Sequence, residues 1–345
     1  MKPISKHTKF FFSCRNRYFI TIARFIIAGA VLVLGCNASD PFIAFAKDRN
    51  TAPVLISGYI QGQASGAKNF RVLQLTDIHT HSGDIGSEEN NQKFYHNLRL
   101  LVNTTKPDLI IVTGDAIADN GDHTGNKDML LFISTISAMN TPWTLALGNH
   151  DQADDIEQME RDLSNASFSY FKSMNKQSAG IGNHYIDLVD KKGSKLWRFY
   201  ILNSGVSGLN KQVLDWFAEK VGSSGSTGDT KMTPPSFAFV HIPLIEFKSV
   251  WDIGGASGMK GEDVCYEQTL PMAIDYFERA NVDNDFRAIF VGHDHANDYH
   301  GVWKDIQLVY GRVSGYNGYG NYPRGAKLIE IDLEKKTFSH RTVLL

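Results

Sequence analysis

The chain alternates between short apolar runs and longer segments in which apolar residues recur at every third or fourth position. Apolar runs of four to eight residues that stop at Gly, Asp or Asn indicate buried strands of an α/β sheet. The sequence contains such runs at residues 71–76, 108–113, 143–147, 236–240 and 287–291. The wider spacing is typical of amphipathic helices and predicts them at residues 88–103, 127–139, 155–163, 211–221 and 267–280.

Two further segments have patterns of their own. Residues 326–345 alternate apolar and polar positions on both sides of Glu334, Lys335 and Lys336, which indicates a closing β-hairpin. Residues 222–235 are rich in Gly, Ser, Thr and Pro and predict a mobile surface loop. The sequence contains no internal repeat.

The N-terminal segment is of a different kind. Six Lys and Arg residues precede the uncharged apolar run 25–35, which is the order of a secretory signal. The run is shorter than the ~20 residues of a membrane span. We therefore predict that residues 1–46 are a signal peptide cleaved after Ala38 or Ala46, with an uncleaved membrane anchor or a lipoprotein box at residues 33–36 as alternatives. The protein is expected to be exported: secreted, periplasmic or membrane-anchored.

Side chains that bind metal ions gather where the predicted strands end. The five fragments are Thr76-Asp77-Ile78-His79, Thr113-Gly114-Asp115, Leu147-Gly148-Asn149-His150-Asp151, Val240-His241-Ile242-Pro243 and Val291-Gly292-His293-Asp294-His295. Ligand sites of α/β sheets lie outside the carboxyl ends of the strands, so we expect these loops to converge on one crevice. Buried Asp and His groups are costly unless a partner or a metal compensates them. The layout predicts a two-metal hydrolase.

Each fragment taken alone has an ordinary structural explanation. Asp77 and His79 are compatible with polar loop positions, Asp115 with a helix cap, and His241 with a hydrogen-bonded core histidine. The occurrence of all five fragments in this order favours a single metal centre.

The ordered set Asp-x-His, Gly-Asp, Gly-Asn-His-Asp, a lone His and Gly-His-x-His resembles the calcineurin-like metallophosphoesterase superfamily from about Arg71 to the end of the chain. Segments 239–244, 292–298 and 310–320 resemble its purple-acid-phosphatase-like branch. The resemblance implies an α/β fold with two mixed β-sheets packed as a sandwich and flanked by helices. We predict one catalytic domain at residues 47–345, for which 42% hydrophobic residues supply a sufficient core.

The resemblance also implies two bound metal ions. The implied ligands are Asp77, His79 and His295 for one ion, Asn149, His241 and His293 for the other, and Asp115 as the bridge between them. Imidazole, carboxylate and amide oxygen without thiolate suit Mn, Fe or Zn. We therefore expect two divalent or mixed-valence ions of this group.

The resemblance further implies hydrolysis without a covalent intermediate, by direct attack of a metal-bound hydroxide on phosphorus. His150 would protonate the leaving oxygen or stabilise the transition state, and Asp151 would orient His150 through a hydrogen bond. A purely structural His150 is the alternative.

The chain departs from purple acid phosphatases proper at two positions. Those enzymes have Gly where His79 stands, and they carry a Tyr ligand shortly after the Gly-Asp pair, where this chain continues Ala116-Ile117-Ala118. Without that tyrosine, no phenolate-to-iron charge-transfer band is expected.

Two residues outside the ligand set are candidate substrate contacts. His81 lies two positions after the first implied histidine ligand, and Arg312 is a candidate phosphate clamp. An exposed loop histidine and a Gly-rich turn with surface side chains are the ordinary explanations, and they stay open.

Charge argues against a nucleic-acid partner. The chain holds 35 Lys and Arg residues and 37 Asp and Glu residues. Residues 1–46 contain six of the basic residues and only one of the acidic residues. A chain without this segment is therefore acidic, and a basic surface for nucleic acid is not expected. Membrane contact is expected through the N-terminal segment alone.

The leading prediction is a metal-dependent phosphomonoesterase that acts on a phosphorylated substrate. A phosphodiesterase, such as one for cyclic nucleotides, has the same ligand set and stays open. A non-enzymatic metal-binding surface protein is the third possibility, and it is disfavoured because every expected ligand position is filled.

Overall fold

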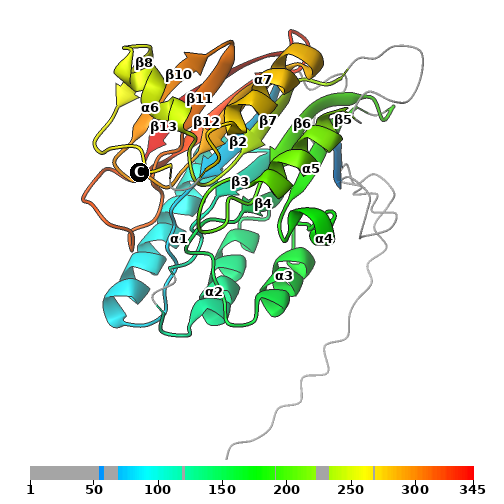
Figure 1. Ribbon diagram of the computed structural model, residues 1–345. Helices are drawn as coiled ribbons and strands as arrows, with labels where there is room; N and C mark the ends of the chain where they lie inside the picture. The colour runs from blue at the N-terminus through cyan, green and yellow to red at the C-terminus, as the bar shows by residue number, and fades with distance from the viewer. Residues whose placement is uncertain (1–53, 58–68, 119–120, 191, 223–232, 267–268) are drawn as a thin grey trace, which may run out of the picture. The chain divides into compact units, whose positions relative to one another are not determined.

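Two mixed β-sheets form the centre of the part of the chain that the structure, a computed structural model, describes (Figure 1). The described residues are 54–57, 69–118, 121–190, 192–222, 233–266 and 269–345. The predicted N-terminal segment 1–46 lies outside them. Within the described residues, no helix is both long enough and apolar enough to cross a membrane.

The five-stranded sheet has the order β13 (Thr337–Leu344), β12 (Gly325–Asp332), β2 (Asn69–Leu75), β3 (Leu109–Thr113) and β4 (Trp143–Ala146). The eight-stranded sheet has the order β1 (Val54–Ser57), β5 (His184–Val189), β6 (Lys195–Ile201), β7 (Ser236–Phe239), β9 (Phe286–Val291), β11 (Ile306–Tyr310), β10 (Asp298–Trp303) and β8 (Ala256–Met259). Strands β2, β3 and β4 are parallel in the first sheet, and β6, β7, β9 and β11 are parallel in the second.

The two sheets pack face to face over one apolar layer. Val72 and Ile111 from the five-stranded sheet belong to the same buried cluster as Phe199, Phe237 and Phe290 from the eight-stranded sheet. Stacked and edge-on aromatic pairs fill this layer, including the stacked pair of Phe239 and Phe290. The predicted sandwich of two mixed sheets is confirmed.

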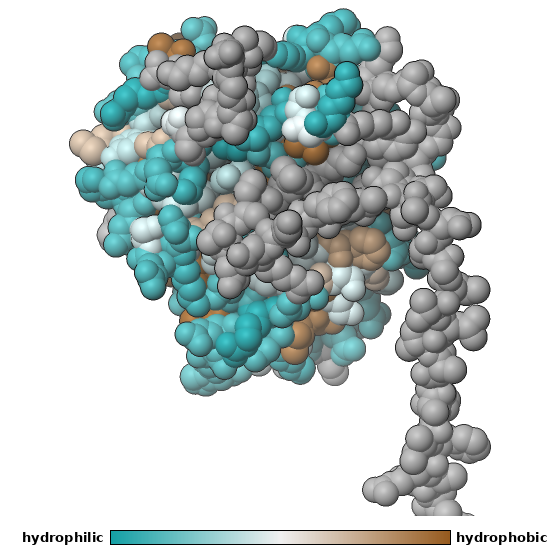
Figure 2. Space-filling model, turned by 90° about the vertical axis from the view of Figure 1, so that its right-hand side faces the viewer, coloured by the Kyte–Doolittle hydropathy of each residue, from teal (hydrophilic) through white to brown (hydrophobic). Residues whose placement is uncertain are grey.

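Helices cover the outer faces of both sheets. The helices on the five-stranded sheet are α1 (Ile85–Thr105), α2 (Gly125–Ser137) and α3 (Ile156–Asn165), which share its second buried cluster. The helices on the eight-stranded sheet are α5 (Lys211–Gly222), α6 (Ile245–Asp252) and α7 (Ala273–Asn284), and the short α4 (Lys176–Ala179) contributes Ala179 to the same cluster. With the large apolar side chains inside, the described atoms on the face seen in Figure 2 are mostly hydrophilic, with small hydrophobic patches between them.

The sequence located most of these elements and misplaced one. The five strands and the closing hairpin lie where the hydrophobic pattern predicts them, within two residues at each end. Helix α7 begins at Ala273, six residues after the predicted start. Pro271 explains the difference, because proline disfavours the helical conformation of the residue before it. Two helices and six strands of the described chain were not predicted individually: α4, α6, β1, β5, β6, β8, β10 and β11. Most of the predicted loop, residues 223–232, lies outside the described residues.

The parallel strands of both sheets end at the same edge. Backbone hydrogen bonds join the loops that follow them: the N–H of Asp77 donates to Gly114 O at 3.1 Å, and the N–H of Gly292 donates to His241 O at 3.0 Å. Each of these bonds links the loops after two neighbouring strands of one sheet. A further bond links the two sheets, because the N–H of His293 donates to the Asp77 carboxylate at 3.1 Å. The five fragments therefore meet, as the sequence predicts.

Candidate metal centre

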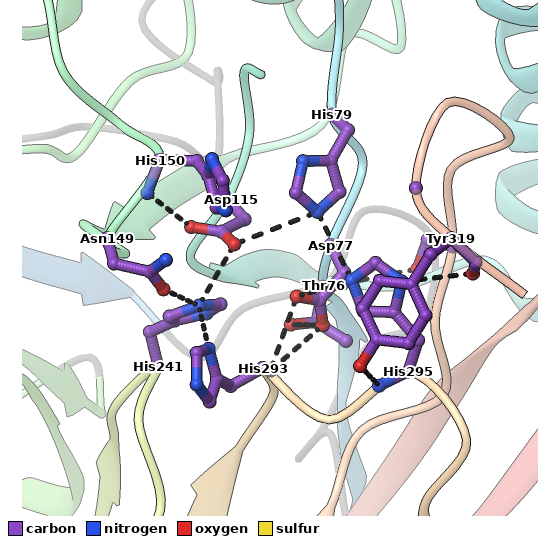
Figure 3. Close-up of polar contacts among 12 residues, drawn as sticks. Thr76, Asp77, His79, Asp115, Asn149, His150, His241, His293, His295 and Tyr319 are labelled. Atoms are coloured by element: carbon purple, nitrogen blue, oxygen red, sulfur yellow. Dashed lines mark hydrogen bonds and ion pairs between the residues drawn. The ribbon is translucent and has the colours of Figure 1, made fainter. Parts of the chain in front are cut away.

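The predicted ligand side chains form two groups at this edge (Figure 3). Asp77, His79 and His295 form the first group, and Asp115, His241 and His293 form the second. Within each group, one ligand atom from every residue lies within 4.8 Å of the others. All are buried except His293, which is partly exposed. Both groups have the composition and spacing to hold a metal ion.

Nitrogen and oxygen atoms converge closely in each group. In the first, His295 Nε2 lies 3.1 Å from His79 Nε2 and 3.4 Å from Asp77 Oδ1. In the second, His241 Nε2 lies 3.2 Å from His293 Nδ1 and 2.9 Å from the amide oxygen of Asn149. Asn149 therefore joins the second group, as the sequence predicts.

One oxygen of Asp115 faces both groups. Its Oδ2 lies 3.2 Å from His241 Nε2 in the second group and 3.7 Å from His79 Nε2 in the first. The other oxygen, Oδ1, accepts a hydrogen bond from the backbone N–H of His150 at 2.9 Å. The position of Oδ2 supports the predicted bridging role of Asp115.

Hydrogen bonds at the far side of two rings fix which nitrogen faces the centre. His241 Nδ1 donates to Thr113 O at 2.8 Å, and His295 Nδ1 donates to Tyr319 O at 3.2 Å. The neutral rings therefore carry their free electron pairs on Nε2, the atom that points inward. Backbone carbonyls hold metal-binding histidines in this way in many proteins.

The inward-facing atoms form a set that requires a positive charge. In neutral His241, the unprotonated Nε2 would face the Asp115 carboxylate and the Asn149 amide oxygen. All three atoms are hydrogen-bond acceptors, so they repel one another unless a positive charge lies between them. Burial lowers the pKa of His241, but the carboxylates of Asp115 and Asp77 raise it more, to about 10. Without a metal ion, a proton therefore supplies the charge. The donor set fits a bound cation.

The backbone is left-handed at four of the seven predicted ligands. The φ angles are 53° at Asp77, 52° at His79, 50° at Asp115 and 78° at His293. Residues other than glycine adopt this conformation rarely, and it costs free energy that the surrounding structure must compensate. The left-handed conformation directs these side chains, which follow different strands, towards the metal centre.

Gly114→Ala is expected to weaken metal binding, whereas Gly180→Ala is not. Both glycines have a φ of 81°, and Gly180 has a ψ of −172°, a region essentially confined to glycine, so we expect alanine to strain the backbone at both positions. A Cβ at Gly114 would lie 2.4 Å from Cγ of His241, while a Cβ at Gly180 would meet nothing within 4 Å. Urea unfolding and metal titration of both variants measure the two effects separately. Displacement of His241 should lower metal affinity by roughly 10–100-fold; equal metal affinity in the two variants would contradict this role of Gly114.

His150 and Asp151 both lie at the centre. His150 lines the cavity, and its ring stands edge-on to His79 at 5.1 Å between centroids. Asp151 is buried, and its two oxygens accept the backbone N–H groups of Gly148 at 2.8 Å and Ile117 at 3.1 Å. Asp151 therefore ties two metal-site loops together, and its hydrogen bond to His150 stays a prediction.

The two predicted substrate contacts differ in position. His81 lines the cavity, and its Nδ1 lies 3.2 Å from the buried carboxylate of Asp128 on α2. Arg312 is absent from the described residues that line the cavity; its Nε donates to Pro323 O at 2.6 Å, and its Nη1 lies 3.8 Å from Asp298. This guanidinium therefore supports the neighbouring loop, and its contact with a phosphate stays a prediction.

The cavity over the two groups has a volume of about 510 Å³. Its walls come from the loops after β2, β3, β4 and β9, from the start of α1, from the segment between β8 and α7, and from the loop between β11 and β12. The last loop supplies Tyr319, which the sequence analysis did not single out. Its ring lies parallel to the His295 ring at 3.9 Å between centroids. The repeated Gly-Tyr pair, at Gly315-Tyr316 and Gly318-Tyr319, was the available signal, but it does not show which ring reaches the centre.

Comparison with known proteins gives consistent results. The family model described as calcineurin-like phosphoesterase matches residues 70–297. "Probable inactive purple acid phosphatase 29" of Arabidopsis thaliana is 25% identical to the chain, and the alignment covers 93% of the chain and 89% of that protein. "Probable inactive purple acid phosphatase 28" of the same plant is 26% identical, over 77% of the chain and 76% of that protein.

Two further similarities extend beyond plants. A probable glycerophosphodiester phosphodiesterase of Arcobacter nitrofigilis is 29% identical, over 61% of the chain and 72% of that protein. Among solved structures, a dimetal phosphatase from Danio rerio aligns with a TM-score of 0.49 and 10% identity, over 76% of the chain and 95% of that structure.

Proposed function

The chain belongs to the calcineurin-like phosphoesterase family, and from this premise we propose that it is a metal-dependent phosphomonoesterase. The observation that carries the proposal is the position of Asp115 Oδ2, which faces a His/Asp group on each side within 3.7 Å. A carboxylate in this position suits a pair of ions that share one ligand.

The seven residues Asp77, His79, Asp115, Asn149, His241, His293 and His295 would hold the two ions. Their imidazole, carboxylate and amide donors suit Mn, Fe or Zn. When bound, such ions would lower the pKa of a coordinated water and neutralise charge on phosphoryl oxygens.

The remaining roles belong to side chains at the cavity wall. His150 lines the cavity, and the bond from its backbone N–H to Asp115 fixes its position beside the centre. We propose that its imidazole gives a proton to the leaving alcohol oxygen. His81, held by Asp128, is the proposed contact to the substrate on the α2 side. Asp151 keeps the loops that carry Asp115 and His150 in register.

Two other functions have support of their own. Similarity to a glycerophosphodiester phosphodiesterase favours a diesterase. The names of the plant relatives contain the word inactive, which favours a protein that binds metal without catalysis. Parallel hydrolysis of p-nitrophenyl phosphate and bis(p-nitrophenyl) phosphate by the purified chain, with and without Mn, Zn or Fe, separates the three. We expect metal-dependent hydrolysis that is faster for the monoester. Faster diester hydrolysis would replace the proposal with a diesterase, and no hydrolysis by metal-loaded protein would reject both.

The iron-loaded protein is expected to lack an intense visible absorption band. Tyr319 is the tyrosine that lines the cavity in the described chain, and its hydroxyl is already engaged. It donates to Glu262 Oε1 at 2.8 Å and accepts the backbone N–H of His295 at 3.2 Å. An absorbance spectrum of the iron-loaded protein tests this expectation. A purple band that disappears in Tyr319→Phe would show instead that Tyr319 binds the iron.

We also propose export, on the basis of the basic and apolar pattern of residues 1–46. The intact mass of protein recovered from the medium or periplasm of the expressing cells tests this. Full-length chain found in the cytosol alone would reject the proposal.

A further inference from the structure

Tyr319 is an exposed aromatic side chain beside a metal group. It is 53% exposed, although most large aromatic side chains of the described chain are buried. It lines the same cavity as His79, His295 and Asp115. Its ring covers the His295 ring on one side, as Figure 3 shows. The exposed ring surface therefore lies within a few atoms of the proposed reaction centre.

The ring is held firmly in spite of its exposure. Three contacts join Tyr319 to His295: the parallel rings, the backbone N–H of His295 to the hydroxyl at 3.2 Å, and His295 Nδ1 to the Tyr319 carbonyl at 3.2 Å. The hydroxyl also donates to Glu262, whose Oε1 accepts the N–H of Ala296 at 2.7 Å. A surface fixed before binding loses little conformational entropy when a ligand packs on it.

The loop on both sides of the ring is fixed as well. Arg324 is buried, and its Nη2 donates to Gly320 O at 2.8 Å and to Gly318 O at 3.3 Å. These two carbonyls flank Tyr319 in the sequence. The loop therefore presents the ring in one orientation, with Gly318 packed against the rings of His295 and His79.

The other cavity walls offer polar contacts, such as the one proposed for His81, but little apolar surface for the alcohol part of a substrate. Among the described lining residues there is no Lys or Arg, so a distant anionic group on the substrate would find no cationic partner there. The lining side chains outside the two metal groups are small or polar, apart from Tyr319. The phenol ring is the large flat surface available to a leaving group.

We propose that Tyr319 determines specificity by stacking on a planar ring of the substrate, so that the enzyme acts on aryl phosphate esters. The inference rests on the proposed phosphoesterase function. Because Tyr319 touches His295, a predicted ligand, the ring that it stacks on must be close to phosphorus. An aromatic ring bonded to the ester oxygen meets this condition, whereas a ring at the end of a long chain does not.

Binding of two non-hydrolysable probes tests the inference without requiring turnover. Benzylphosphonate and cyclohexylmethylphosphonate have the same charge and ring size, but only the first ring is planar and aromatic. Calorimetric titration of the metal-loaded full chain should show benzylphosphonate binding about 3–10-fold more tightly, the usual gain of an aromatic pair beyond area burial. Tyr319→Phe should keep this preference, and Tyr319→Leu should reduce it to about 1-fold with both metal ions retained.

Tyr322→Leu is the matched control, because Tyr322 lies in the same loop and outside the described cavity lining. It should keep the wild-type preference. Equal affinity of the wild type for the two probes would overturn the inference, as would an unchanged preference in Tyr319→Leu. Loss of metal in Tyr319→Leu would also overturn it, because Tyr319 would then serve to hold His295.

The same experiment separates this inference from the proposed function. Preferential binding of benzylphosphonate by a protein that hydrolyses no ester would support the aromatic surface and reject the phosphatase. Hydrolysis of phenyl and alkyl phosphates at similar rates, together with equal binding of the two probes, would support the phosphatase and reject the role of Tyr319.

Discussion

Replacing Asp115 with alanine is expected to empty both metal sites and to lower kcat/KM for p-nitrophenyl phosphate by more than about 100-fold. Changing a residue that merely supports a metal ligand typically costs 10–100-fold, and Asp115 is expected to contact both ions itself. Its Oδ2 is shared by the two groups, and its Oδ1 holds the backbone of His150. The variant therefore loses the bridge and the anchor of the neighbouring loop together.

Metal analysis of protein purified without chelator, combined with steady-state kinetics, measures this effect. Wild-type protein should approach two ions per chain. Asp263→Ala serves as the control, because it removes an exposed acid two residues before Cys265, which lines the cavity. That variant should match the wild type in both measurements. Full metal occupancy and full activity in Asp115→Ala would reject a shared centre built on Asp115.

His150→Asn is expected to keep both metal ions and to lose on the order of 10²–10⁴-fold in kcat. The imidazole lines the cavity beside His79, so it can reach a leaving oxygen without itself belonging to either group of ligands. The loss should shrink as the leaving group improves, because an alcohol of low pKa departs without being protonated.

A series of phosphate esters with leaving alcohols of different pKa provides the measurement. The slope of log kcat against leaving-group pKa should become steeper in His150→Asn than in the wild type. His96→Asn, which changes an exposed histidine on α1, should leave the slope unaltered. Loss of metal in His150→Asn would make His150 a ligand, and a wild-type rate on poor leaving groups would rule out the proposed proton transfer.

The site-bearing strands and the metal-binding fragments were predictable because both are recognised from short, local sequence patterns. An apolar run such as residues 108–113 signals a buried strand wherever it pairs, and the polar residues that follow it must then lie at the end of that strand. The order of the five fragments added the family resemblance. The start of α7 was mispredicted because the apolar spacing continues on both sides of Pro271 and hides the break.

The roles of several polar residues were not predictable, because they depend on which atoms face one another after folding. The sequence places Asp151 next to His150, yet the carboxylate turns to the N–H of Ile117, in a loop 34 positions away. Arg312 is close to the centre along the chain, but its side chain points to Pro323 and Asp298.

The sequence by itself therefore determined the positions of the site-bearing strands and the identities of the groups at their ends, since hydrophobic period and donor chemistry are local properties. The sandwich of two sheets came from the family resemblance that those groups carry. The tertiary structure alone decided that carbonyls from distant loops turn Nε2 of His241 and His295 inward and that Tyr319 covers His295. These features depend on left-handed backbone angles and on contacts between loops far apart in the chain, and no local pattern specifies either.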